Sequence, residues 1–424
     1  MNKPTKNSRL VAAKILSEWL ENGSFPEQRL SKIKDSRFFV MEVVHGCIRK
    51  NSILMWAMNR WVKKPPTFLT QAIIHVGFYQ ILFMDNTEVY ASINECVEAS
   101  KKQPNGLGAA KLVNAVLRKC DRESSKLLID LEKEKEFLKL SHPEELFTGW
   151  IDQYGEEKAR TLAIWNNKPA KTIIRINQLR ISADKFKEEL NENNIECIIH
   201  PASKKEIFFY VPRGISVVKL PGYNKGWFTV QDPATIHAVD LLSPKDSESV
   251  LDACAAPGGK TILIAERMNY GKSITAMELH EDRIPRLLEN LKRNQWEDIE
   301  VINGDARYSE KYLGNKKFDA ILLDVPCSNT GVLQRRSDAR WRVGSERMKE
   351  LNKLQLNILE SCSKLLNPNG RMVYSTCSLE QEENEFLIDK WMLSNKNFYL
   401  KKSIKIFPPD TLTDGGYAAL ICRN

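Results

Sequence analysis

The sequence lacks several features that would assign it to a large class of proteins. No apolar run approaches the roughly 18 residues needed to cross a bilayer, and the basic N-terminal stretch has no apolar signal core. The nine cysteines are odd in number and form no C-x-x-C pair, which indicates neither a disulfide framework nor a zinc site. We therefore expect a cytoplasmic monomer with free thiols, no membrane association and no metal.

Two nucleotide-binding patterns are also missing. A dinucleotide site would need G-x-G-x-x-G, which the glycine loop at residues 254–261 does not contain. The phosphate-loop pattern GxxxxGK[ST] ends correctly at Gly259-Lys260-Thr261, but it would need a glycine where Cys254 stands. The sequence therefore disfavours a dehydrogenase and a nucleoside triphosphatase.

The net charge is +9 over 424 residues, and it is unevenly distributed. Residues 1–150 carry 23 Lys or Arg against 17 Asp or Glu, and the short stretch 335–347 carries five Arg against two acids. This excess favours a polyanionic partner, although a basic protein with solvated lysines would give the same totals.

The chain is long enough for two or three domains. Residues 1–143 show apolar residues at helical spacing, interrupted at Lys64-Pro65-Pro66 and Gln103–Gly106, and predict an all-α domain. Residues 144–235 contain three short strand patterns around one helix pattern, ADKFKEELNEN, and predict a small α+β domain. Residues 236–424 alternate strand and helix, which predicts an α/β Rossmann-like domain around a mostly parallel sheet.

A candidate cofactor loop follows the first strand of this third domain. SVLDACAAPGGKT places Asp252 at the strand end and a helix start near Lys260, with a loop of small residues between them: Cys254, Ala255, Ala256, Pro257, Gly258 and Gly259. Small side chains allow a ligand to approach the backbone closely, and the helix N-terminus offers unpaired N–H donors. Glu278, Asp305 and Asp324 also stand at strand ends, where ligands bind in such sheets.

Two cysteines stand immediately beyond buried strands, in Asp324-Val325-Pro326-Cys327 and Ser375-Thr376-Cys377-Ser378. Free cysteines are more often simply buried. Six others are interpreted in that way: Cys47, Cys96, Cys120, Cys197, Cys362 and Cys422. Cys254 is intermediate, because it lies in the cofactor loop, and no catalytic role is given to its thiol. The pair has a chemical meaning if the acceptor is the C5 carbon of cytosine, which is too weakly nucleophilic to attack a methyl donor. A thiolate that attacks C6 makes C5 carbanion-like, and Asp324 would stabilise the adduct near N3.

These motifs resemble a known family. LDACAAPGGKT, DAILLDVPCSNTGVLQRR and VYSTCSLEQEENE resemble the RNA 5-methylcytosine methyltransferases of the NOL/NOP/Sun group, and the helical region with VNAVLR resembles the NusB-like RNA-binding domain fused to its bacterial 16S ribosomal RNA members. The resemblance implies a seven-stranded methyltransferase domain, S-adenosylmethionine as cofactor and small-subunit ribosomal RNA as partner.

The resemblance also implies roles for individual residues. Cys377 would be the nucleophile and Cys327 the thiol that assists product release, whereas DNA cytosine methyltransferases attack with the Pro-Cys thiol. The stretch Cys254–Lys260 with Asp252 and Asp324 would bind the cofactor, Glu278 its ribose and Asp305 its adenine. The sequence departs from the family at Arg336-Ser337-Asp338, where relatives tend to have His-Pro-Asp; the arginine suits a phosphate contact.

Other functions stay open from the sequence. The protein could be an RNA-binding module with a degenerate enzyme domain, or a methyltransferase that acts on DNA or protein. Intact Cys377, Cys327 and Asp324 disfavour degeneracy, and a protein acceptor has no use for two thiols. Trp227, Phe228 and Trp341 are candidates for stacking on an extruded base, but each suits a core position equally well.

Overall fold

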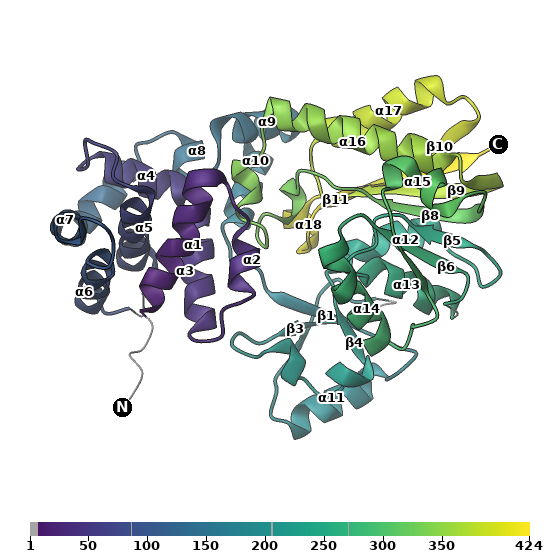
Figure 1. Ribbon diagram of the computed structural model, residues 1–424, viewed down its shortest axis with the longest axis horizontal. Coiled ribbons are helices and arrows are strands. Elements are labelled where there is room, and N and C mark those ends of the chain that lie inside the picture. The colour runs from purple at the N-terminus through teal and green to yellow at the C-terminus, as the bar shows by residue number, and fades with distance from the viewer. Residues whose placement is uncertain (1–6, 86, 205–206, 270) are drawn as a thin grey trace. The chain divides into compact units, whose positions relative to one another are not determined.

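The computed structural model describes residues 7–424 except 86, 205–206 and 270. The described chain divides into two compact units (Figure 1). The first comprises the residues up to 168 together with residues 336–342, and the second comprises residues 169–335 and 343–424.

Within its described residues the first unit contains only helices, as the sequence predicts for residues 1–143. Helix α5 lies at its centre, and its residues 70–80 are buried among α1, α3, α6 and α7. Both predicted breaks lie between helices, and a turn at residues 132–135 separates α7 from α8. The helices are α1 (Ser8–Asn22), α2 (Pro26–Leu30), α3 (Arg37–Arg49), α4 (Asn51–Asn59), α5 (Phe68–Phe83), α6 (Val89–Ser100), α7 (Gly106–Leu131), α8 (Glu136–Lys139), α9 (Glu144–Tyr154) and α10 (Glu156–Asn166). Among the described residues, no helix is both long and apolar enough to span a bilayer.

Residues 336–342 belong to this helical unit although they follow the Pro-Cys motif in the chain. The fully buried guanidinium of Arg340 donates to the backbone oxygens of Ser141 and Asn166. The indole of Trp341 donates to the carbonyl of Ile48. Because burying a guanidinium is costly unless its donors are satisfied, these carbonyls fix the segment in place.

The second unit begins with a small antiparallel sheet. Strands β1 (Thr172–Ile176), β2 (Ile198–Ile199), β3 (Phe208–Val211) and β4 (Phe228–Val230) are arranged in the order β2-β3-β1-β4. Helix α11 (Ala183–Glu192) packs Phe186 and Leu190 against the strands. The buried side chain of Arg175 on β1 pairs with Glu266, which lies in the part of the unit that contains the large sheet, so a charge-assisted contact joins the two parts of this unit.

The large sheet has seven strands within the described residues, in the order β10-β11-β9-β8-β5-β6-β7. Its central strands are parallel, as predicted, whereas β11 lies antiparallel to both β9 and β10. The strands are β5 (Val250–Asp252), β6 (Ile274–Glu278), β7 (Glu300–Asn303), β8 (Phe318–Asp324), β9 (Leu366–Thr376), β10 (Phe398–Ile406) and β11 (Gly416–Arg423), and the main helices are α12 (Ile236–Leu242), α13 (Gly259–Met268), α14 (Ile284–Arg293), α15 (Ser309–Leu313), α16 (Ser345–Ser363), α17 (Glu385–Ser394) and α18 (Pro408–Thr411). The strand order reverses beside β5, which pairs with both β6 and β8. A ligand crevice is expected at the carboxyl ends of the strands there.

Candidate functional site

The two strand-end thiols meet at this edge of the sheet. Strands β8 and β9 are parallel, with Asp324 opposite Ser375, so the loops that follow them leave side by side. The sulfur atoms of Cys327 and Cys377 are 3.1 Å apart. The Cys377 thiol also lies 3.2 Å from the side-chain oxygen of Asn329, which accepts from it.

The surroundings of the two thiols differ. The hydrogen bond with Cys377 is the largest cause that raises the pKa of Cys327 well above its usual value, and burial and the charges of Cys377 and Glu383 act in the same direction. Cys327 is therefore held in its protonated form.

An ion pair links the thiol site to the cofactor loop. The ammonium of Lys260 lies 2.7 Å from a carboxylate oxygen of Asp324. Burial opposes the charge on Lys260, but the attraction of Asp324 outweighs it, and the pKa of Lys260 is raised. Since Cys377 also stabilises the charge on Lys260, this ammonium supplies a positive field at the thiol, which is a condition for thiolate formation.

The loop Cys254–Lys260 follows the end of β5 and contacts the end of β6. The backbone N–H of Ala256 donates to Glu278, and Gly258 has φ +98°, a conformation that favours glycine. A Cβ on Gly258 would lie 2.7 Å from a methyl group of Leu287. The loop thus requires small residues at its turn, as the sequence indicates. Burial raises the pKa of the Cys254 thiol well above its usual value, so no role is given to this thiol.

The acids at the strand ends differ in how much hydrogen-bonding capacity they keep. Asp252 is fully buried; one of its oxygens accepts from Thr261, while the other has no hydrogen-bond partner. Such an orphaned buried acceptor fits a donor or cation supplied by a ligand. Glu278 accepts from the N–H groups of Ala256 and His280, and an open, shallow hollow lined by residues 279–282 follows it directly. The carboxylate of Asp305 is already paired with Arg307.

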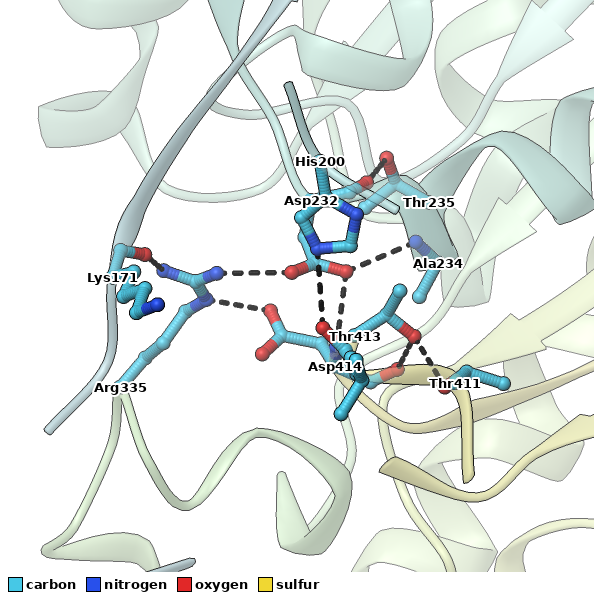
Figure 2. A network of polar contacts seen from close by, with 10 residues as sticks. Lys171, His200, Asp232, Ala234, Thr235, Arg335, Thr411, Thr413 and Asp414 are labelled. Atoms are coloured by element: carbon cyan, nitrogen blue, oxygen red, sulfur yellow. Dashed lines mark hydrogen bonds and ion pairs between the residues drawn. The ribbon is translucent and has the colours of Figure 1, made fainter. Parts of the chain in front are cut away.

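The Pro-Cys loop ends on a polar network that the sequence analysis did not identify. Figure 2 shows the guanidinium of Arg335 between the carboxylates of Asp232 and Asp414, at 2.9 and 2.7 Å. The N–H of Asp414 donates to Asp232, and the ring of His200 contacts the carbonyl of Leu412. The small sheet, the Pro-Cys loop and the start of β11 are thereby held together. Arg335 was noted in the sequence only as part of the Pro-Cys motif and of the arginine-rich stretch, and neither indicated Asp232 or Asp414 as its partner.

The arginine-rich stretch is less available to a polyanion than its composition indicates. Arg335 and Arg340 are engaged as described above, and Arg342 pairs with Asp338 and with two backbone carbonyls. Arg336 is exposed, and its phosphate contact stays a prediction. Arg347 pairs with Glu350. Counting charge along this stretch was therefore misleading, because four of its five arginines bind internal partners.

The aromatic candidates for base stacking are mostly structural. Phe228 is fully buried in the core of the small sheet, so stacking on a base is wrong for it. Trp341 is partly buried and packs against the core of the helical unit. Trp227 is partly buried beneath the ammonium of Lys225. Over the residues that the structure describes, no cluster of three or more His, Cys, Asp or Glu could hold a metal ion.

Three family descriptions match successive parts of the chain. Residues 6–122 match the NusB family, residues 142–215 match the ferredoxin-like domain of RsmF/B-like methyltransferases, and residues 239–419 match the 16S rRNA methyltransferase RsmB/F family. The proposed boundaries at 143/144 and 235/236 stay predictions; in the structure, α9 and α10 pack with the first unit.

Similar proteins and structures agree with this assignment. The ribosomal RNA small subunit methyltransferase B of Klebsiella pneumoniae is 33% identical over 91% of this chain and 89% of its own length, and that of Erwinia tasmaniensis is 31% identical over the whole of both chains. A methyltransferase homologue from Pyrococcus horikoshii is 28% identical, with a TM-score of 0.59, over 68% of this chain and 98% of its own. The structure of PH0851 shares the fold over 99% of both chains, with a TM-score of 0.78 at 24% identity. The chain therefore belongs to the RsmB/F family of 16S ribosomal RNA methyltransferases.

Proposed function

We propose that this enzyme uses S-adenosylmethionine to methylate C5 of a cytosine in 16S ribosomal RNA, through a covalent bond between Cys377 and C6. The observation that carries the proposal is the 3.1 Å approach of two thiols at the carboxyl ends of β8 and β9, beside a loop of small residues that suits a bound cofactor. The names of the full-length relatives support the class of RNA.

The cofactor loop fits S-adenosylmethionine. Asp252 has a buried oxygen without a partner, Gly258 keeps the loop free of side-chain bulk, and Glu278 stands beside the hollow at residues 279–282. Residues 254–260 would hold the cofactor together with Asp252 and Asp324. Glu278 would bind its ribose. Asp305 would bind its adenine end, with its carboxylate accepting hydrogen bonds from both the adenine and Arg307. When bound, the cofactor supplies an electrophilic methyl group on a positively charged sulfur.

The residues at the thiol site divide the chemistry between them. The Cys377 thiolate, favoured by the Lys260 ammonium, attacks C6 and gives C5 carbanion character. Asp324 stabilises the adduct near N3 of the base. After C5 has taken the methyl group, its proton must leave so that the bond between C6 and sulfur can break and restore the Cys377 thiolate.

Formation of the bond between the Cys377 sulfur and C6 also prepares Cys327 for product release. The hydrogen bond that Cys327 donates to the Cys377 sulfur is the largest cause of the raised pKa of Cys327, and the Cys377 charge adds to it. Both contributions disappear once the Cys377 sulfur is bonded to C6. The Cys327 proton is then held less tightly, so this thiol becomes able to assist removal of the C5 proton at the stage when that is needed.

Incubation with tritiated S-adenosylmethionine and unmodified 16S RNA tests the proposed function. We expect the label to appear as 5-methylcytidine when the RNA is digested to nucleosides. An excess of unlabelled duplex DNA of equal length should reduce this labelling no more than another polyanion of equal charge does. Label in another nucleoside would contradict C5 chemistry, and transfer to the DNA would contradict the choice of substrate. Absence of transfer to any nucleic acid would favour the binding-only alternative.

Cofactor affinity should depend on pH through Asp252. Burial is the largest cause that raises the pKa of Asp252, to about 6, against the lowering effect of its hydrogen bond with Thr261. Below pH 6 the carboxyl is therefore protonated, and binding of the positively charged cofactor must first remove that proton. We expect the Kd for S-adenosylmethionine, measured by calorimetry, to rise about tenfold between pH 7 and pH 5.

The Asp252→Asn variant is the control for this pH dependence. It should bind the cofactor more weakly at pH 7, and its Kd should change little between pH 7 and pH 5. A wild-type Kd that stays constant over this range would contradict a role for the ionised Asp252 carboxylate.

A further inference from the structure

Two buried polar residues follow the Ser-Thr-Cys motif and precede helix α17. Glu383 and Asn384 are both fully buried, although they lie in the acidic, polar run LEQEENE. Burying a carboxylate and an amide is costly unless their hydrogen bonds are satisfied. Their partners show what these two side chains hold.

Glu383 holds the residues on either side of Cys327. Its carboxylate accepts from the backbone N–H of Ser328 at 2.9 Å and from the Ser328 hydroxyl. The amide of Gln355, on α16, donates to the same carboxylate at 2.8 Å and to the carbonyl of Pro326 at 2.9 Å. The Cys327 backbone is therefore fixed from both sides by one carboxylate and the glutamine bound to it.

Asn384 does the same for Cys377. Its amide nitrogen donates to the carbonyl of Ser378 at 3.0 Å, and its amide oxygen accepts from the hydroxyl of Thr376 at 2.6 Å. The residues on either side of Cys377 are thus bound by a single side chain. An amide suits this position, because the site requires one donor and one acceptor.

The two halves are joined to each other and to the sheet. The hydroxyls of Ser328 and Ser378 lie 2.9 Å apart, and the Tyr374 hydroxyl on β9 donates to the backbone carbonyl of Glu383 at 2.7 Å. Glu383 and Asn384, which are neighbours in the chain, therefore each bind one of the two thiol loops. The contact between Ser328 and Ser378 and the bond from Tyr374 hold the two loops against each other and against the sheet.

We propose that Glu383 and Asn384 are positioning residues, with Glu383 setting the place of Cys327 and Asn384 that of Cys377, so that the two sulfur atoms are held within reach of the same base. The inference rests on the proposed function for the roles of the thiols. It goes beyond that function in assigning each thiol its own support, so that the attack and release steps can be weakened independently.

The thiol geometry can be tested without RNA by titration with phenylarsine oxide, whose arsenic bonds two closely spaced thiols and releases water. Wild type and Glu382→Gln, a matched change at the exposed neighbour, should bind the reagent at this pair equally tightly. Glu383→Gln and Asn384→Asp should bind it at least about tenfold more weakly, since each leaves a donor or acceptor mismatched. The Cys327→Ala variant identifies the signal that belongs to this pair.

The RNA reaction tests the division between the two residues. With saturating cofactor, Glu383→Gln should accumulate a denaturant-stable protein–RNA adduct, because release through Cys327 is slowed. Asn384→Asp should instead form the adduct about tenfold or more slowly and accumulate none, with the KM for S-adenosylmethionine within about twofold of wild type in both variants. A general loss of packing would not give opposite adduct levels.

Equal behaviour of both variants and Glu382→Gln in the two assays would overturn the proposal, as would the same adduct pattern in Glu383→Gln and Asn384→Asp. If a variant loses cofactor binding through misfolding, Gln355→Met replaces Glu383→Gln, since it removes the contacts with Pro326 and Glu383 and should give the same accumulation. If wild type makes no 5-methylcytidine, the proposed function fails, and the arsenical titration alone still decides whether these residues place the thiols.

Discussion

Replacing Cys377 with serine should lower the rate of methyl transfer to 16S RNA by at least about 1000-fold. A serine hydroxyl keeps the size of the side chain, but it does not ionise near neutral pH and is a far weaker nucleophile than a thiolate. The Lys260 ammonium, held by Asp324 at 2.7 Å, favours a thiolate at this place and cannot compensate for an alcohol. Single-turnover transfer from tritiated cofactor measures the effect, and the Kd for the cofactor should change little.

Cys197→Ser is the matched control for this substitution. Cys197 is a partly buried cysteine beside the small sheet, away from both thiol loops, and its variant should retain wild-type activity. A Cys377→Ser enzyme that keeps more than about a tenth of the wild-type rate would show that the nucleophile lies elsewhere, and Cys327 would become the candidate.

Replacing Cys327 with alanine should convert the enzyme into one that traps its own product. Attack by Cys377 and methyl transfer do not need the second thiol, whereas removal of the C5 proton does in our account. We expect a protein–RNA adduct that survives denaturing electrophoresis to approach one per enzyme molecule, while turnover beyond the first cycle falls about 100-fold or more.

The double variant Cys327→Ala/Cys377→Ser tests whether this adduct depends on the assigned nucleophile. It should form no adduct, because no thiol remains beside the base. Normal multiple turnover by Cys327→Ala, or an adduct in the double variant, would contradict the division of roles between the two cysteines.

The parts of the site that follow directly on strands were predictable from the sequence. Asp252, Glu278 and Asp324 each end a strand of the parallel sheet, and parallel strands present their carboxyl ends at one edge. The same geometry predicts that Cys327 and Cys377 approach each other. Predicting the places of these residues required only that the strands be recognised, and the run of apolar residues before each motif indicated each strand.

Contacts between distant segments were not predictable in this way. Arg335 pairs with Asp232 and Asp414, which lie about 80 to 100 positions away in the chain, and Arg340 reaches carbonyls in the helical unit. No local pattern encodes such partners. The supports at Glu383 and Asn384 were missed for a related reason, because an acidic run after a motif normally indicates a solvated surface.

The antiparallel edge of the sheet was also missed. Strand β10 has the sequence FYLKKSIKI, with lysines on much of its exposed length. Charged residues of this kind are common on edge strands, where they discourage pairing with another chain, but they weaken the apolar alternation from which a strand is predicted. The parallel centre, which carries the site, was unaffected by this omission.

The central claim is that Cys377 forms the bond to the cytosine. The most direct measurement uses wild-type enzyme, S-adenosylmethionine and 16S RNA that contains 5-fluorocytosine, because fluorine cannot leave C5 as a proton does and the adduct persists after methyl transfer. Protease and nuclease digestion followed by mass spectrometry then identifies the modified peptide. Our account predicts a methylated fluorocytosine nucleotide on the peptide that contains Cys377; the same nucleotide on the peptide that contains Cys327 would contradict it.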